Sequence, residues 1–245
     1  MNTAASGCAV VTGAASGIGA AVLRCFAEAG HPVLGVDVDD SGRRLADELA
    51  AAGAEAEWIT GDVAAEETWQ RVAERTPRMH VLVSNAYAVA VKPVHETTPE
   101  EWRRQLAVNL DAAYLGFRAC LPALRKGGGS VVLVSSVHAH AGIPGHAAYA
   151  ASKGALLSLT GQLAVDYGPG IRVNCVLPGP IATAAWDRVD AEGRERSAAS
   201  TVLGRLGDPA EVAAAVHFLA SAQASYITGS SLLVDGGWTV RKDSA

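Results

Sequence analysis

A tyrosine and a lysine stand four residues apart near the start of the segment AAYAASKGALLSLTGQLAVDYG, which covers residues 147–168. The segment is predicted to be a mostly buried helix, and residues four apart on a helix are neighbours on its surface. An ammonium beside a phenol favours the phenolate, so Lys153 is expected to lower the pKa of Tyr149. Such a phenol can act as a general acid or base near neutral pH. The alternative is a tyrosine that packs along a lysine stem, because the spacing alone is common.

A glycine-rich stretch, TGAASGIG over residues 12–19, follows an apolar run and opens a helical pattern. Gly13, Gly17 and Gly19 would let the backbone turn tightly and approach a pyrophosphate, which the N-terminus of the following helix attracts. The next apolar run ends in Asp37, which lies 18 residues after Gly19. This is close to the spacing at which an acidic residue binds the ribose hydroxyls of a dinucleotide. A turn that needs positive φ would explain one glycine but not the set.

Asp37 also bears on the type of dinucleotide. A carboxylate at this position would repel a 2′-phosphate, and neither TGAASGIG nor the stretch DVDD at residues 37–40 contains Arg or Lys. The predicted cofactor is therefore NAD rather than NADP.

Short apolar runs alternate with longer helical patterns along the whole chain. This alternation is typical of βαβ units, and strands that are continuously apolar indicate a parallel sheet covered on both faces. We expect an α/β fold: a single-domain Rossmann-type doubly wound parallel sheet over residues 1–245, with about seven strands and helices on both faces. The segment 180–207, Ala-rich, charged and poorly periodic, is expected to be a substrate lid. Strands are predicted at 8–12, 32–37, 56–60, 79–84, 130–136, 171–179 and 231–237, and helices at 17–29, 41–53, 66–76, 99–125 with a break near Asn109, 147–168 and 208–221.

Composition excludes several classes of function. The 245 residues are 49% hydrophobic with a formal net charge of −5, which does not favour nucleic-acid binding. The absence of an apolar run of about 18 residues, and of a basic region before the first apolar stretch, predicts neither a membrane span nor a signal peptide. The four scattered cysteines are expected to be reduced thiols in a cytoplasmic protein rather than metal ligands.

The motifs together resemble the short-chain dehydrogenase/reductase family over essentially the whole chain. Residues 12–19 match its TGxxxGIG loop, and Tyr149 and Lys153 match its YxxxK motif. Ser136 precedes Tyr149 by 13 residues, which is the family's spacing, and Asn109 lies in a matching LAVNL stretch. The resemblance implies that Tyr149 is the acid/base, Lys153 also holds the nicotinamide ribose, Ser136 binds the substrate oxygen and Asn109 supports a proton relay.

The resemblance also implies the cofactor-binding residues. Asp62 would hold the adenine amino group, and the LPGPIAT loop would contact the nicotinamide carboxamide. The family's NNAG motif reads SNAY at residues 84–87, so Tyr87 either narrows the pocket or packs outward. The expected cofactor set is Gly13, Ser16, Gly17, Ile18, Gly19, Asp37, Asp62, Val63, Asn85, Ala86, Tyr149, Lys153, Pro178, Gly179, Ile181 and Thr183.

The expected function is an NAD-dependent oxidoreductase that interconverts a secondary alcohol or hemiacetal and a carbonyl by hydride transfer, without a metal. Histidines in SSVHAHAGIPGHAAY could bind the hydroxyls of a sugar or polyol, and SSVH is similar to the glucose 1-dehydrogenases of the family. If these histidines instead face solvent, the alternative is a 3-oxoacyl reductase or a dehydrogenase of cyclic or hydrophobic alcohols. The non-enzyme alternative is a binding module that senses NAD(H). The expected substrate residues are Tyr87, Ser136, His138, His146 and Trp186.

The helices expected around residues 109–125 and 149–166 are apolar on more than one face. One sheet face cannot cover so much apolar surface, and surplus apolar surface indicates an interface. Because members of the family commonly pair these helices with symmetry mates, a homotetramer is expected.

Overall fold

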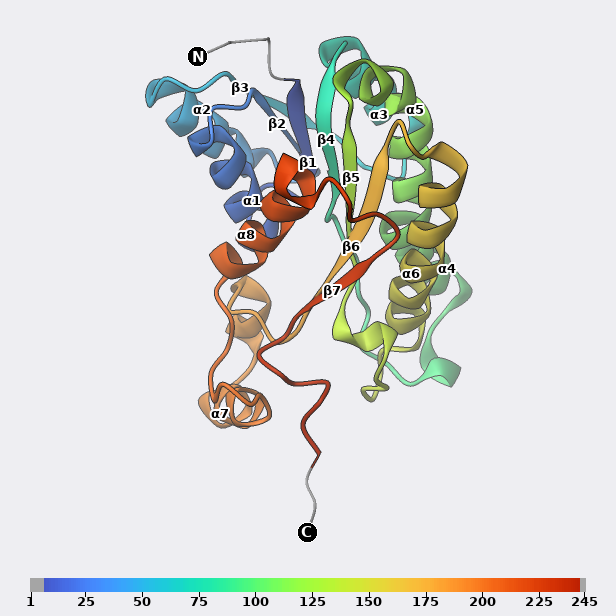
Figure 1. The fold of residues 1–245 in the computed structure, drawn as a ribbon. Coiled ribbons are helices and arrows are strands. Elements are labelled where there is room, and N and C mark those ends of the chain that lie inside the picture. The colour runs from blue at the N-terminus through green and yellow to red at the C-terminus, as the bar shows by residue number, and fades with distance from the viewer. Residues whose placement is uncertain (1–6, 243–245) are drawn as a thin grey trace.

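A computed structural model describes residues 7–242, and within them seven parallel strands form one sheet (Figure 1). Their order is β3-β2-β1-β4-β5-β6-β7, so the chain winds outward in both directions from β1 and β4. The predicted fold class is confirmed; residues 1–6 and 243–245 of the predicted domain lie outside the described residues. The strands are β1 (Cys8–Thr12), β2 (Val33–Asp37), β3 (Ala56–Thr60), β4 (Met79–Ser84), β5 (Ser130–Val134), β6 (Arg172–Pro178) and β7 (Ser231–Val234).

Helices cover both faces of the sheet and lie near their predicted positions (Figure 1). One face is covered by α1 (Gly17–Glu28), α2 (Arg43–Ala51) and α8 (Pro209–Ala220). The other face is covered by α3 (Glu66–Arg75), α5 (Ala112–Gly127) and α6 (Ala147–Tyr167), and α4 (Pro99–Leu106) packs beside α6.

Each of the strands β1 to β6 contributes to two cores, which explains their largely apolar sequences. In β1, Val10 packs with Leu34 and Phe117 on the α5 face, whereas Val11 packs with Leu23 and other residues on the α1 face. Both valines are fully buried. Successive side chains of a strand point to opposite faces, so a strand covered on both sides has few positions that face water.

The break expected near Asn109 is a π-helical turn, η3 (Ala107–Asp111), which joins α4 to α5. At the other end, α4 starts with a capping box in which Thr98 and Glu101 bind each other's backbone N–H groups, and Pro99 occupies its first turn. Single π turns inside helices often occur at functional sites.

The segment 180–207 contains two short helices, η5 (Ala184–Arg188) and α7 (Ala191–Ala199). Its two ends are tied together, because Ala182 N–H donates to Gly207 O at 2.8 Å and Gly207 N–H donates to Pro180 O at 2.9 Å. The segment therefore forms a closed loop beyond the carboxyl end of β6 (Figure 1). Among residues 7–242, no helix is long and apolar enough to cross a membrane.

The chain reverses its winding direction between β1 and β4, whose carboxyl ends lie side by side. Here Thr12 Oγ1 accepts hydrogen bonds from Asn85 N–H at 2.9 Å and from Ala86 N–H at 3.1 Å. Open α/β sheets bind ligands outside the carboxyl ends of the strands at such a reversal point. The fold therefore places the glycine loop and the SNAY loop in contact with each other at the edge of the sheet where a ligand is expected.

Candidate active site

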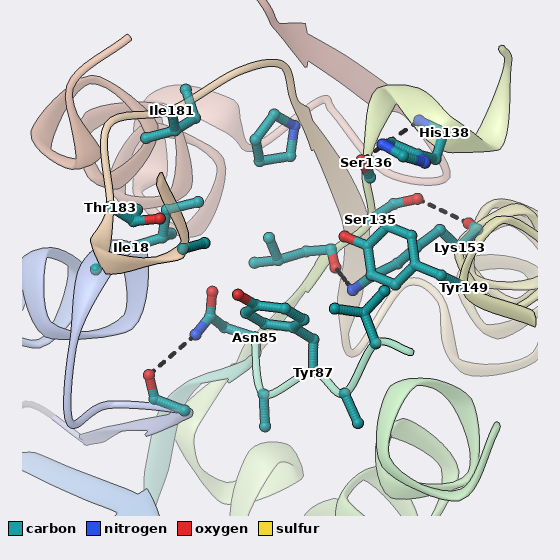
Figure 2. Close-up of a pocket in the computed structure, with 18 of the residues that line it drawn as sticks. Ile18, Asn85, Tyr87, Ser135, Ser136, His138, Tyr149, Lys153, Ile181 and Thr183 are labelled. Carbon is teal, nitrogen blue, oxygen red and sulfur yellow. Dashed lines mark hydrogen bonds between the residues drawn. The ribbon is translucent and has the colours of Figure 1, made fainter. Parts of the chain in front are cut away.

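A cavity of about 840 Å³ opens at the carboxyl ends of the strands and is lined by most of the residues singled out from the sequence (Figure 2). Of the expected cofactor set, all but Gly19 line it, and so do all five expected substrate residues. Ser136, Tyr149 and Lys153 line it as well, whereas Asn109 does not. The motifs scattered along the chain thus meet at one cavity.

The glycine loop forms a cradle for an anionic group at one side of this cavity. Gly13 and Gly17 have positive φ values of 65° and 53°, which side-chain-bearing residues rarely adopt. A Cβ on Gly19 would lie 2.0 Å from Gly13 O, so this glycine lets α1 pack closely on the loop. Ser16 precedes α1 without capping it through its side chain, which leaves the N–H groups of the first turn to a ligand. The cradle fits the pyrophosphate of a dinucleotide.

Asp37, at the carboxyl end of β2, lines the cavity next to the glycine loop. Its Oδ2 accepts a hydrogen bond from Ala15 N–H at 3.0 Å, and its Oδ1 accepts one from Asp39 N–H at 3.1 Å. The backbone of two loops therefore fixes the carboxylate, whose remaining lone pairs are available to ribose hydroxyls.

Asp62 forms an ion pair with Arg104, a residue that no motif of the sequence links to it. Arg104 Nη1 lies 2.6 Å from Asp62 Oδ2, and Asp62 Oδ1 accepts a hydrogen bond from Ala64 N–H at 2.9 Å. Partial burial acts to raise the pKa of the Asp62 carboxyl, but hydrogen bonds from Arg104 and Ala64 outweigh it, and the pKa is lowered. The ion pair keeps an ionised carboxylate at the end of the cavity where adenine is expected.

Tyr149 and Lys153 both lie at the cavity, but their proton affinities differ from the expectation. Lys153 is buried and its ammonium donates to Val134 O at 2.7 Å, while its Nζ is 5.5 Å from the centre of the Tyr149 ring (Figure 2). Burial raises the pKa of Tyr149 to about 12, and burial lowers the pKa of Lys153 to about 8. The expected lowering of the Tyr149 pKa is therefore not found in the unliganded protein, where desolvation is the largest effect on the phenol.

Ser136 and Ser135 differ in what their hydroxyls contact. A side-chain hydrogen bond with Ser136 acts to lower the pKa of Tyr149, against the larger effect of burial. Ser135 Oγ instead donates to Lys153 O at 2.7 Å, which fixes α6 against the end of β5. Ser136 is thus the serine whose hydroxyl faces the phenol, and Ser135 has a structural contact.

Asn109 supports the cavity from behind. Its side chain is 2% exposed, accepts from Ala88 N–H at 2.7 Å, and donates to Ala88 O at 2.9 Å and to Ser152 Oγ at 3.0 Å. Ser152 Oγ in turn donates to Tyr149 O at 2.7 Å. The π turn therefore connects the loop after Tyr87 to the first turn of α6.

Tyr87 lies in the cavity rather than packing outward. Its ring centre is 6.2 Å from that of Tyr149 with the planes at 71°, and 52% of the residue is exposed (Figure 2). Of the two expectations for this residue, the narrowed pocket is the one that the structure has.

Two of the three loop histidines gather at Tyr149. His138 has its ring centre 5.1 Å from that of Tyr149 and 4.7 Å from that of His146, whereas His140 is exposed and does not line the cavity. Burial, followed by the nearby His146 and Lys153, lowers the pKa of His138 to about 4, so its imidazole is neutral at pH 7. Among residues 7–242, no group of His, Cys, Asp or Glu side chains is arranged to hold a metal ion.

Further lining residues carry no motif and were missed from the sequence. They come from the loop after Tyr87, from α4 and from the region after β7, and only the folded chain brings these regions together. They are Val89, Val91, Arg104 and Trp238, whereas Val189, Ser197 and Ser200 line the cavity from the segment that was expected to be the lid.

Comparisons with known proteins agree with this arrangement. A family model described as "Enoyl-(Acyl carrier protein) reductase" matches residues 13–239. The chain is 39% identical over 239 residues to the cyclopentanol dehydrogenase of Comamonas sp. (strain NCIMB 9872), a match that covers 94% of this chain and 96% of that protein. It is 40% identical over 238 residues to the cis-4-hydroxycyclohexanecarboxylate dehydrogenase of Sinomonas cyclohexanicum, again covering 94% and 96%.

A solved structure of the same architecture belongs to a protein from Beutenbergia cavernae assigned as an NAD(P)-dependent gluconate 5-dehydrogenase, with NADP bound at low occupancy. It superposes with a TM-score of 0.91 at 40% identity and covers 97% of this chain and 98% of that one. The crevice at the reversal point and these relatives define a nicotinamide-dinucleotide oxidoreductase. The chain belongs to the short-chain dehydrogenase/reductase family, and the prediction of an enzyme that acts on CH–OH groups is confirmed.

Proposed function

We propose that this protein is an NAD-dependent dehydrogenase of a secondary alcohol carried on a small ring. The observation that supports this best is the meeting of Ser136, Tyr149 and Lys153 with the glycine cradle at one cavity. Such a set of acid/base, oxygen-binding group and dinucleotide cradle serves the interconversion of a carbinol and a carbonyl.

Each of these residues has a separate task in the proposed reaction. A bound nicotinamide supplies the acceptor or donor of hydride. Ser136 binds the substrate oxygen and stabilises the charge that develops on it. Tyr149 takes the carbinol proton at its phenolic oxygen during oxidation and returns it during reduction. Lys153 holds the nicotinamide ribose, and Asn109 supports a proton path toward solvent in addition to its contacts with Ala88 and Ser152.

Asp37 supports NAD as the cofactor. Its carboxylate is fixed by Ala15 N–H and Asp39 N–H at the place where the adenosine ribose is expected. A 2′-phosphate there would meet a fixed negative charge, whereas ribose hydroxyls would find hydrogen-bond acceptors. The other residues of the expected set serve as the remaining cofactor contacts.

Apolar side chains that line the cavity favour a substrate with a mostly apolar ring. Val89, Val91, Ile143 and Trp186 line the cavity along with Tyr87. Two relatives are named for alcohols on five- and six-membered carbocycles, which agrees with such walls. A sugar or polyol, which the histidine loop led us to expect, is the alternative substrate, since His138 and His146 line the same cavity.

We extend the proposal to the organisation of the protein. Residues 1–245 act as a single catalytic domain, and the segment 180–207 acts as the substrate lid, since Trp186 and Val189 from it line the cavity. The assembly is a homotetramer, and its location is cytoplasmic.

The test is formation of NADH from NAD⁺ with a panel of cyclic secondary alcohols, aldoses, polyols and 3-hydroxyacyl thioesters. We expect cyclic alcohols to give the strongest signal, and Tyr149→Phe to lose about 10²–10⁴-fold in kcat while it still folds and binds NADH. A signal confined to acyl thioesters would favour the 3-oxoacyl reductase. Normal kcat in Tyr149→Phe would refute the proposed role of the phenol, and NADH binding without turnover of any compound would favour a sensor.

A further inference from the structure

Two histidine rings form part of the cavity wall directly beside the tyrosine. His138 and His146 have ring centres 5.1 and 6.2 Å from that of Tyr149, and 4.7 Å from each other. Both line the cavity, whereas His140 between them in sequence does not. Any substrate whose carbinol reaches Tyr149 therefore has its neighbouring atoms next to two imidazoles.

The hydrogen-bonding polarity of His146 follows from its backbone contact. Its Nδ1 lies 2.8 Å from Pro144 O, and a carbonyl oxygen can only accept. Nδ1 therefore carries a proton, so the neutral ring presents a bare Nε2. In its neutral form, His146 offers the cavity a hydrogen-bond acceptor.

His138 has the opposite polarity. Its Nδ1 is buried, with no hydrogen-bond partner among the described residues. A proton on that atom would be an orphaned buried N–H donor, which proteins tolerate less well than an unmet acceptor. The neutral ring therefore carries its proton on Nε2. Because Nδ1 is enclosed and the ring borders the cavity, the edge with Nε2 faces the cavity and offers it a donor.

A donor and an acceptor side by side match a hydroxyl group, which both accepts and donates one hydrogen bond. We propose that His138 and His146 together bind a second hydroxyl of the substrate, close to the carbinol at Tyr149, so that the preferred substrate is a diol on a small carbocyclic ring. This inference rests on the proposed dehydrogenase function.

Part of the remaining wall is apolar, which favours a carbocyclic ring as the carrier of that hydroxyl. Val89, Val91, Ile143 and Trp186 contribute apolar surface to the cavity and no hydroxyl-binding group apart from the indole N–H of Trp186. Burying further hydroxyls against these side chains without partners would be costly. This histidine pair would also bind a carboxylate poorly, because an ionised carboxylate only accepts hydrogen bonds and only one of the two rings offers a donor.

The experiment compares kcat/KM for cyclopentanol with that for cis- and trans-1,2-cyclopentanediol, with saturating NAD⁺, for wild type, His138→Phe, His146→Phe and the control His140→Phe. The ratio of kcat/KM for a diol to kcat/KM for cyclopentanol does not depend on the fraction of active enzyme. A variant preparation that is partly misfolded therefore still gives a valid ratio. We expect at least one diol to be preferred about tenfold by wild type, the ratio to fall toward one in both pocket variants, and the ratio to stay unchanged in His140→Phe.

Three results would overturn the inference. A wild-type ratio of one or below for both diols would show that the pair binds no hydroxyl. A high ratio that survives in both His138→Phe and His146→Phe would assign the preference to other residues. Failure of wild type to oxidise any alcohol, including these, would overturn the proposed function itself, which is distinguishable because the first two results require turnover.

Discussion

The ammonium of Lys153 donates a hydrogen bond to Val134 O at 2.7 Å and, from there, lies 5.5 Å from the centre of the Tyr149 ring. The lysine is thus engaged with the end of β5. Burial dominates at both groups: it raises the pKa of Tyr149 to about 12 and lowers that of Lys153 to about 8. The unliganded site therefore holds a neutral phenol, and ionisation requires additional positive charge.

Tyr149 is expected to titrate at very different pH values in the free protein and during turnover. In the free protein, ultraviolet difference titration of wild type against Tyr149→Phe should show no phenolate from this residue below about pH 10. With saturating NAD⁺, the added positive charge favours the phenolate, so kcat/KM for alcohol oxidation should rise with pH with an apparent pKa well below 12. A phenolate from Tyr149 near pH 9 in the free protein would contradict this prediction.

Asp37 is expected to determine the preference between the two nicotinamide cofactors. Wild type should have a higher kcat/KM with NAD⁺ than with NADP⁺. Asp37→Ser should raise kcat/KM with NADP⁺ at least about tenfold, since it removes a charge that repels the 2′-phosphate. The same substitution should lower kcat/KM with NAD⁺, because it removes acceptors for the ribose hydroxyls. Asp47→Asn, an equal change of charge at an exposed position on α2, is the control and should leave the preference as it is. Wild-type preference for NADP⁺ would refute the assignment.

A histidine cluster far from the candidate active site is expected to make the fold sensitive to acid. His31 and His80 stack with ring centres 4.4 Å apart, and Phe26 contacts both of them and His217. Burial, then the charges of His31, His217 and Arg172, lowers the pKa of His80 to about 4. Since this pKa lies below the unfolded value of about 6.5, the stability from neutral His80 is complete above pH 6.5 and is lost as pH falls toward 4.

The corresponding measurement is urea unfolding of wild type and His80→Leu at pH 8 and pH 5. From pH 8 to pH 5, the free energy of unfolding of wild type should fall by on the order of 1–2 kcal/mol more than that of the variant. This figure already includes a reduction for the partial exposure of the His80 ring. Equal losses in the two proteins would show that His80 is not the group responsible.

The exposed apolar side chains of α6 and β7 are expected to lie in subunit interfaces. Val165 on α6 is 78% exposed, and Leu233, on the edge strand β7, is 41% exposed. Light scattering at micromolar concentration should give about four times the chain mass of 25.1 kDa. Val165→Asp and Leu233→Asp should each lower the mass of the assembly, whereas Val94→Asp, at an exposed position in the short helix η2 (Val94–Glu96), should not. A monomeric wild type would refute the homotetramer.

The parts of the fold that depend on local sequence were predictable. Gly13 and Gly17 mark the cradle because few other residues adopt their backbone conformation, and the continuously apolar strands identify a sheet covered on both faces. The break near Asn109 was also visible, although its π geometry was not.

The remaining features depend on which distant segments meet. Tyr87 turns inward because its loop is tied to Asn109, and Arg104 reaches Asp62 from a helix 42 residues further along the chain. Trp238 lines the cavity although its segment carries no motif that points there. The proton affinity of Tyr149 was mispredicted because a spacing of four residues says nothing about burial, which dominates its pKa.

The π turn η3 makes chain length, and not only residue identity, important between α4 and α5. A π turn contains one residue more than an α-helical turn, and each residue rotates an α-helix by about 100°. A one-residue deletion at Leu110 would let the two helices run on as one regular helix, and α4 and Asn109 would then swing round its axis relative to α5. The amide of Asn109 could no longer face Ala88 and Ser152 together. The extra residue changes the rotation between α4 and α5. The side chains of α5 can therefore pack on the sheet while Asn109 faces the loop at Ala88.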